Sequence, residues 1–235
     1  MFFFDPTMII LIPGILLAIY AQYKVHSAFA KCSKIPSRRG ITGREAARIV
    51  LESAGMEAHF GEDAGKGVGI SAIEGSLSDH YDPRSRQLRL SEPVYKSTSL
   101  AAIGIAAHEA GHAIQHHQGY APMAARSILV PFATFGPFAS MILLIAGIIM
   151  AHPLLIKIGV VVFSLYVAFA LVTLPVEFNA SSRALKLIEA NGIVSADEIP
   201  QVRQVLNAAA MTYVAGAVMA ILSLLRLLII ANRSD

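Results

Sequence analysis

Residues 128–151 read ILVPFATFGPFASMILLIAGIIMA and contain no Asp, Glu, Lys or Arg. A helix of about 20 apolar residues is long enough to cross the hydrocarbon core of a bilayer. Three further stretches qualify or nearly do, at 8–23, 154–174 and 208–230. The alternative is a soluble protein with buried core helices, but such helices are usually shorter and carry a polar face. The sequence therefore predicts a mostly α-helical membrane protein with about four transmembrane helices.

The first apolar stretch is predicted to remain in the protein as a membrane anchor. A cleaved signal peptide begins with a basic region, whereas this chain begins MFFFDPT, with one acid and no Lys or Arg. The small-residue pattern AFA at 28–30 resembles a cleavage site, but it lies beyond Lys24 and His26. We therefore interpret residues 1–23 as an N-terminal transmembrane anchor.

Basic residues cluster directly after this anchor and predict the orientation of the chain. Between Lys24 and Arg48 the chain carries many Lys and Arg side chains and a single acid, Glu45. Positive residues near membrane ends stay in the cytoplasm, so the N-terminus is expected outside and the following region inside. No aromatic interleaving or binding motif accompanies the basic run, which argues against a nucleic-acid partner. The single cysteine, Cys32, excludes an intramolecular disulfide.

The polar middle of the chain is predicted to form one small α+β domain. A helix is expected after Thr42, whose side chain can form a capping box with Glu45, and Gly55 is expected to end it. Residues 76–95, SLSDHYDPRSRQLRLSEPVY, show the turn residues and the alternation of a β-hairpin. The glycine-rich residues 61–75 lack the spacing and the Gly-Lys-Ser/Thr ending of a phosphate-binding loop, so no nucleotide site is expected there.

The stretch AAHEAGHAIQHH, residues 106–117, concentrates histidines on one predicted helix, which a residue at 97–99 can cap. Positions i and i+4 share a face of a helix, so His108 and His112 lie one above the other. Two imidazoles at this spacing can bind one Zn²⁺, and Glu109 beside them can accept a proton from water activated by the metal. Small residues around the motif let another element or a substrate approach. We predict one zinc site per chain.

A third ligand must come from elsewhere, because a catalytic zinc usually takes three protein ligands. His116 extends the i, i+4 series, but it lies a further turn away from a metal held between His108 and His112. The third histidine of the metzincins is absent, since Gln115 and Gln118 stand where their Gly and His would be. A carboxylate is therefore the more favoured third ligand.

Topology narrows the choice of carboxylate. An even number of membrane crossings returns the chain to its starting face, and Glu177 is the first carboxylate after the apolar pair 128–174. Pro175 allows a new helix to begin there, with Glu177 and Ser181 on one face. In the alternative interpretation Glu177 is an ordinary acid in the first turn of that helix. A carboxylate between residues 57 and 92 is a further candidate.

Three separated blocks, LSDHYDPRSRQLRLSEPVY, AAHEAGHAIQH and PVEFNASSRAL, resemble the YugP-like family of bacterial membrane proteins, classed as neutral zinc metallopeptidases. H-E-x-x-H, an apolar pair and a later glutamate are also similar to the gluzincin peptidases of the HtpX and CAAX prenyl protease types. The resemblance implies a zincin-like catalytic domain in which His108, His112 and Glu177 bind zinc and Glu109 is the general base. Ser181 stands where the HtpX pattern has an aspartate that orients a ligand histidine. The candidates for that orienting role are Asn179, Ser181 and His116.

The predicted organisation follows from the apolar stretches and the motif: 1–23, N-terminal anchor; 24–127, cytoplasmic zincin-like domain with the H-E-x-x-H helix; 128–174, transmembrane hairpin; 175–204, cytoplasmic helical segment with the third zinc ligand; 205–235, C-terminal transmembrane helix. The predicted location is the cell membrane, with several crossings.

The predicted activity is that of a zinc metalloendopeptidase of the gluzincin type, acting on a peptide or membrane-protein substrate. Candidate substrate or oxyanion contacts are His80, Tyr81, Arg183 and Tyr213, and the hairpin near 80–90 offers an edge strand to an extended substrate. Expected partners are the lipid bilayer, a membrane-complex subunit or a second copy of the chain. The alternative is a metal-bearing scaffold without proteolytic activity, against which the intact Glu109 argues.

Overall fold

The computed structural model describes residues 6–62, 65, 67–75 and 78–232. The ends of the predicted anchor (1–5) and of the predicted C-terminal span (233–235) lie outside the described residues, as do parts of the glycine-rich stretch (63–64 and 66) and the start of the predicted hairpin (76–77). The predicted class is confirmed: the chain is mostly helical and has one small sheet.

Two compact units make up the chain, and three long helices contribute to both. The described part of the first unit is 6–22, Ala121–Pro175 and 211–232, and the second unit is Tyr23–Tyr120 with Val176–Ala210. The long helices are α1 (Ile12–Cys32), α5 (Ala121–Ile149), α6 (Pro153–Ala190) and α7 (Ile199–Asn232), and a short 3₁₀-helix, Pro6–Leu11, leads into α1.

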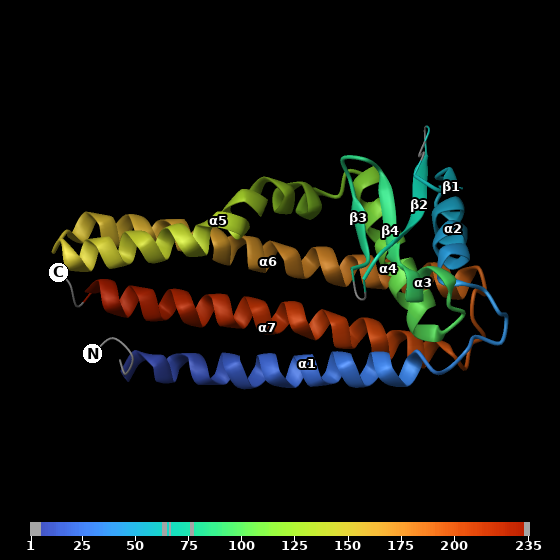
Figure 1. Cartoon of the computed structure of the whole chain (residues 1–235), viewed down its shortest axis with the longest axis horizontal. Coiled ribbons are helices and arrows are strands. Elements are labelled where there is room, and N and C mark those ends of the chain that lie inside the picture. Colours follow the sequence, from blue (N-terminus) through green and yellow to red (C-terminus); the bar gives the residue numbers. More distant parts are fainter. Residues whose placement is uncertain (1–5, 63–64, 66, 76–77, 233–235) are drawn as a thin grey trace. The chain divides into compact units, whose positions relative to one another are not determined.

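Four helical segments in the described residues are long and apolar enough to cross a bilayer: Pro6–Cys32, Ala121–Ile149, Pro153–Ala190 and Ile199–Asn232 (Figure 1). In the first unit their large apolar side chains are widely exposed; Phe135 is 69% and Ile149 is 78% exposed. Contiguous apolar surface of this kind is unfavourable in water and suits a hydrocarbon environment. The predicted set of about four membrane helices is therefore present.

Helices α5 and α6 form a tight antiparallel pair within the first unit. The hydroxyl of Ser140 donates to the carbonyl oxygen of Gly159 at 2.8 Å, across the two helices. A Cβ at Gly159 would lie 3.1 Å from the Ser140 carbonyl oxygen, so the glycine allows the backbones to approach. Small residues at a helix contact are the usual means of close packing in membranes. Ala151, with φ 49°, lies in the turn between the helices.

The prediction that a new helix begins at Pro175 is wrong, because α6 runs without interruption from Pro153 to Ala190. Proline removes one backbone donor and crowds the preceding turn, but a long helix in a membrane tolerates this when its neighbours compensate. Glu177 therefore lies far inside a helix. The interpretation of Glu177 as a first-turn acid is wrong for the same reason.

The second unit contains the sheet and three short helices (Figure 1). In chain order these elements are α2 (Gly43–Ser53), β1 (Ala58–Phe60), β2 (Val68–Ile73), β3 (His80–Asp82), β4 (Gln87–Ser91), α3 (Glu92–Lys96) and α4 (Leu100–His117). The strand order is β1-β2-β4-β3, with β1, β2 and β4 parallel. The antiparallel pair of β3 and β4 confirms the predicted hairpin and places β3 at an edge of the sheet.

Two helices of this unit begin at predicted cap positions, whereas α3 was not predicted and begins within residues 76–95, which the sequence assigned to the hairpin. Thr42 and Glu45 form the expected capping box at the start of α2, and the hydroxyl of Ser99 accepts a hydrogen bond from the N–H of Ala102 at the start of α4. Helix α4 is buried along most of its length among the apolar side chains of α2 and the sheet. The H-E-x-x-H motif is thus carried by the central helix of the second unit.

Candidate metal centre

Three ligand atoms from two helices converge in the second unit. Helix α4 contributes His108 and His112, and α6 contributes Glu177. Oε2 of Glu177 lies 3.2 Å from Nε2 of His108 and 3.5 Å from Nε2 of His112. Ligands at about 2.0–2.1 Å from a tetrahedral zinc are separated from one another by about 3.3 Å. The three side chains are therefore positioned to bind a metal ion of this kind.

The close approach of α4 and α6 depends on the small residues inside the motif. A Cβ at Gly111 would lie 2.7 Å from the carbonyl oxygen of Ala180 on α6, so any larger residue would push the helices apart. Ala180 lies one helical turn beyond Glu177. The sequence predicted that small residues around the motif admit another element, and α6 is that element.

Each ligand histidine has a hydrogen-bond partner on its second ring nitrogen. Nδ1 of His108 lies 3.1 Å from the hydroxyl of Ser181, which is 8% exposed. Nδ1 of His112 lies 3.0 Å from Oε1 of Gln115. Such partners hold an imidazole in the orientation and the tautomer that a metal requires. Ser181, a sequence-predicted candidate, thus contacts His108 at the position where the HtpX pattern has an aspartate.

The carboxyl of Glu109 is separate from the three ligand atoms but interacts electrostatically with all three ligand side chains. Burial raises its pKa above the ordinary value, and this effect is opposed by His112 and His108 and reinforced by Glu177 and Asp79. A carboxylate with a raised pKa is a stronger proton acceptor once ionised. The carboxyl of Glu109 therefore lies within electrostatic range of all three candidate ligands, in surroundings that disfavour its charged form.

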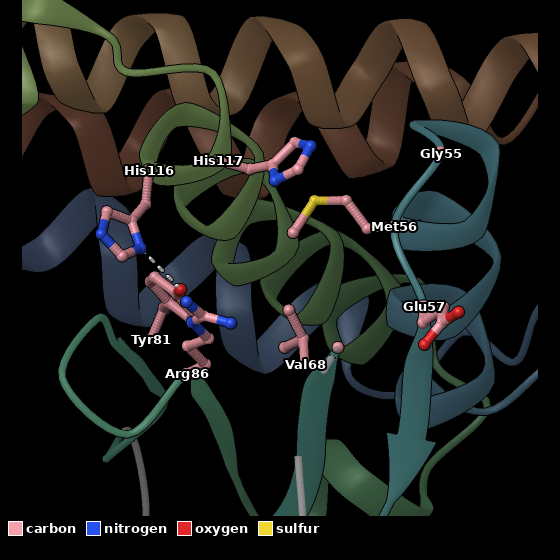
Figure 2. A pocket seen from close by; sticks show the side chains of 9 residues that line it. Gly55, Met56, Glu57, Val68, Tyr81, Arg86, His116 and His117 are labelled. Atoms are coloured by element: carbon pink, nitrogen blue, oxygen red, sulfur yellow. Dashed lines mark hydrogen bonds between the residues drawn. The ribbon is translucent and has the colours of Figure 1, made fainter. Parts of the chain in front are cut away.

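Two of the predicted substrate contacts lie on the edge strand β3. Nδ1–H of His80 donates to the carbonyl oxygen of Ser78 at 2.8 Å. The hydroxyl of Tyr81 lies 2.9 Å from Nδ1 of His116, and Figure 2 draws this hydrogen bond as a dashed line. Burial raises the pKa of Tyr81 to about 12. His116 is exposed and is not part of the metal-binding group found among the described residues.

The other candidates are placed differently. Nε of Arg183 donates to Oδ1 of Asn179 at 2.6 Å, and its Nη1 donates to Oε1 of Gln118 at 2.5 Å, so this guanidinium joins α6 to the end of α4. Asn179 also accepts a hydrogen bond from Gln115. Tyr213 lies on α7 in the first unit, and its role stays a prediction.

A cavity of about 560 Å³ lies at the C-terminal end of α4, between that helix and the sheet (Figure 2). Its lining combines apolar side chains with ionisable ones, among them Met56, Glu57, Val68, Tyr81, Arg86, His116 and His117. None of the three metal-binding side chains lines it. Two predicted site residues, Tyr81 and His116, line the cavity, and they are hydrogen-bonded to each other.

Sequence reasoning missed Gln115, which it treated only as the residue replacing a metzincin glycine. The side chain is 0% exposed and contacts both His112 and α6. Its position three residues after His112 was the available signal, since i and i+3 share a helix face. A polar side chain between apolar neighbours on a ligand-bearing face is a candidate partner for the ligand.

Comparison with known proteins shows the family to which the chain belongs. The family described as "Putative neutral zinc metallopeptidase" matches residues 7–232, and the chain belongs to this family. Its relatives include the "Putative membrane protease YugP" of Bacillus subtilis (strain 168), which is 42% identical over 214 residues, or 91% of each chain. No solved structure matches the chain. Zn²⁺ is therefore the cofactor, and the four apolar helices belong to a multi-pass membrane protein.

Proposed function

We propose that this chain is a membrane-embedded zinc endopeptidase of the gluzincin type, with His108, His112 and Glu177 as the zinc ligands and Glu109 as the general base. The observation that carries the proposal is the convergence of three ligand atoms, with Oε2 of Glu177 at 3.2 and 3.5 Å from Nε2 of the two histidines, beside the separate carboxyl of Glu109. The description of the family and the name of the Bacillus relative support a proteolytic role.

The chemistry divides between the metal and the side chains of this chain. When bound, Zn²⁺ lowers the pKa of water toward about 7 and polarises a carbonyl group. Glu109 accepts the proton of the attacking water and transfers it to the leaving amine, so one carboxyl acts first as base and then as acid. Ser181 lies within hydrogen-bond distance of Nδ1 of His108 and can hold that imidazole in place while this occurs.

The oxyanion that develops on the substrate needs a hydrogen-bond donor, and we propose His80 for this role. Because its Nδ1–H is bonded to the carbonyl oxygen of Ser78, its Nε2 can donate only in the imidazolium form. The edge strand β3 that carries His80 can also pair with an extended substrate.

The orientation in the membrane is part of the proposal. Basic side chains between Lys24 and Arg48 favour a cytoplasmic second unit and an N-terminus outside the cell. The predicted segments 24–127 and 175–204 would then be cytoplasmic, and the substrate would be a peptide or a segment of a membrane protein.

A non-proteolytic scaffold is the alternative, because the three ligands alone suffice for a structural metal site. The side chain that distinguishes the two is Glu109, which a structural site does not need. Detergent-purified protein should cleave casein in a zinc-dependent manner, and Glu109→Gln should abolish the cleavage while keeping its zinc. Glu189→Gln, on the exposed part of α6, serves as the matched control and should cleave normally. Equal cleavage by wild type and Glu109→Gln would contradict the proposed mechanism.

A further inference from the structure

Gln115 is fully buried where α4 contacts α6, and both its amide oxygen and its amide nitrogen have hydrogen-bond partners. Its Nε2 donates to the carbonyl oxygen of Val176 at 2.8 Å and to Oδ1 of Asn179 at 3.0 Å. Its Oε1 lies 3.0 Å from Nδ1 of His112. A buried amide that is satisfied at both ends is held in one orientation, because a flip would oppose like groups.

The direction of these bonds determines where the proton of His112 lies. The carbonyl oxygen of Val176 can only accept a hydrogen bond, so it faces the amide nitrogen of Gln115. The amide oxygen then faces His112, whose Nδ1 must carry a proton to donate to it. A neutral imidazole protonated on Nδ1 has its lone pair on Nε2. Nε2 is the atom that lies 3.5 Å from Oε2 of Glu177, on the side of the metal centre.

We infer that Gln115 is a positioning residue for the metal centre, which holds His112 in the tautomer able to bind zinc and ties it to α6. The inference rests on the proposed function, since it takes His112 and Glu177 as ligands of one zinc. Val176 directly precedes Glu177, so a single side chain orients ligands from both helices. Histidines that bind metals usually donate their second N–H to a carboxylate or a carbonyl, and here an amide oxygen is the acceptor.

Two substitutions separate this role from simple helix packing. Gln115→Met keeps the length of the side chain and removes its hydrogen bonds, and it should raise the Kd for Zn²⁺ by about 10–100-fold. Gln115→Glu still accepts the Nδ1–H of His112, through a charge-assisted bond, but it cannot donate to Val176. Gln115→Glu should therefore bind Zn²⁺ at least about tenfold more tightly than Gln115→Met. Both constants are measured on the full chain in detergent by competition with a chromophoric zinc chelator.

Gln118→Met is the matched control. It removes a second glutamine that links the end of α4 to α6, since Oε1 of Gln118 accepts a hydrogen bond from Arg183, and it leaves the bond between Gln115 and His112 in place. Its zinc affinity should stay close to that of the wild type. The visible absorption spectrum of the Co²⁺-loaded protein should change in Gln115→Met, where the ligand is free to rotate, and stay unchanged in Gln118→Met.

The outcomes separate the inference from the proposed function. Equal loss of zinc affinity in folded Gln115→Met and Gln115→Glu would mean that Gln115 only fastens the two helices, which overturns the inference. If Gln115→Glu does not fold, the Co²⁺ spectrum of Gln115→Met decides, and an unchanged spectrum overturns it. Wild-type zinc affinity in Gln115→Met overturns this inference alone. A wild-type protein that neither binds zinc nor cleaves casein contradicts the proposed function instead.

Discussion

At the scale of single residues, the candidate metal centre depends on the missing side chain of Gly111 as well as on its ligands. Gly111 has no side chain facing the backbone of α6, and a Cβ there would lie 2.7 Å from the Ala180 carbonyl oxygen. Backbone atoms cannot move aside as the end of a flexible side chain can. The distance between His112 and Glu177 is therefore set partly by a residue that binds nothing.

Gly111→Ala should weaken Zn²⁺ binding by about tenfold or more, because separated helices cannot keep three ligands at bonding distance. The matched control is Gly136→Ala in α5, where a Cβ would meet its nearest atom at an ordinary 3.6 Å. Zinc affinity of both variants is measured by chelator competition. Unchanged affinity in Gly111→Ala would show that α4 and α6 can bring the ligands together without this contact.

The residues of the site differ in how far the sequence predicted them. His108, Glu109 and His112 follow from the spacing of one helix, so local periodicity was sufficient. Glu177 required a count of membrane crossings and a family resemblance, because its contact with α4 spans a large sequence separation. For Gln115 the i, i+3 spacing from His112 was a local signal, but its contact with α6 is to the backbone carbonyl oxygen of Val176, whose position no sequence pattern records.

At the scale of elements, side chains that act on their own helix or hairpin were the predictable ones. The caps at Thr42 and Ser99 and the hairpin of β3 and β4 depend on neighbours within a few residues. Strands β1 and β2 were not predicted, since parallel strands pair with distant segments and β2 contains Gly69, against which the Gln87 side chain packs. The uninterrupted α6 was also not predicted, because the effect of Pro175 depends on its surroundings.

Thr42→Ala should lower the free energy of unfolding by about 1 kcal/mol, because the first turn of α2 loses the hydroxyl of its capping box. Glu45→Ala should cost a similar amount, and the double variant should cost less than the sum, since each residue serves the same box. Unfolding is followed in detergent at constant zinc. Fully additive losses would mean that the two side chains act independently.

At the scale of the whole molecule, the orientation proposed for the membrane is open to direct labelling. Single cysteines at Glu62 and His152, in a Cys32→Ser background, place one thiol in the second unit and one between α5 and α6. In intact cells the thiol at 62 should resist a membrane-impermeant reagent and the thiol at 152 should react, because the basic residues keep the second unit inside. The opposite pattern would place the metal centre outside the cell.

The central claim is that two histidines from α4 and one glutamate from α6 hold a single zinc. The most direct measurement is the zinc content per chain of purified Glu177→Ala, compared with Glu109→Gln and Glu189→Ala. The account predicts zinc strongly reduced in Glu177→Ala, and one zinc per chain in both Glu109→Gln and Glu189→Ala, since neither of these residues belongs to the metal-binding group. Full zinc content together with full peptidase activity in Glu177→Ala would contradict it.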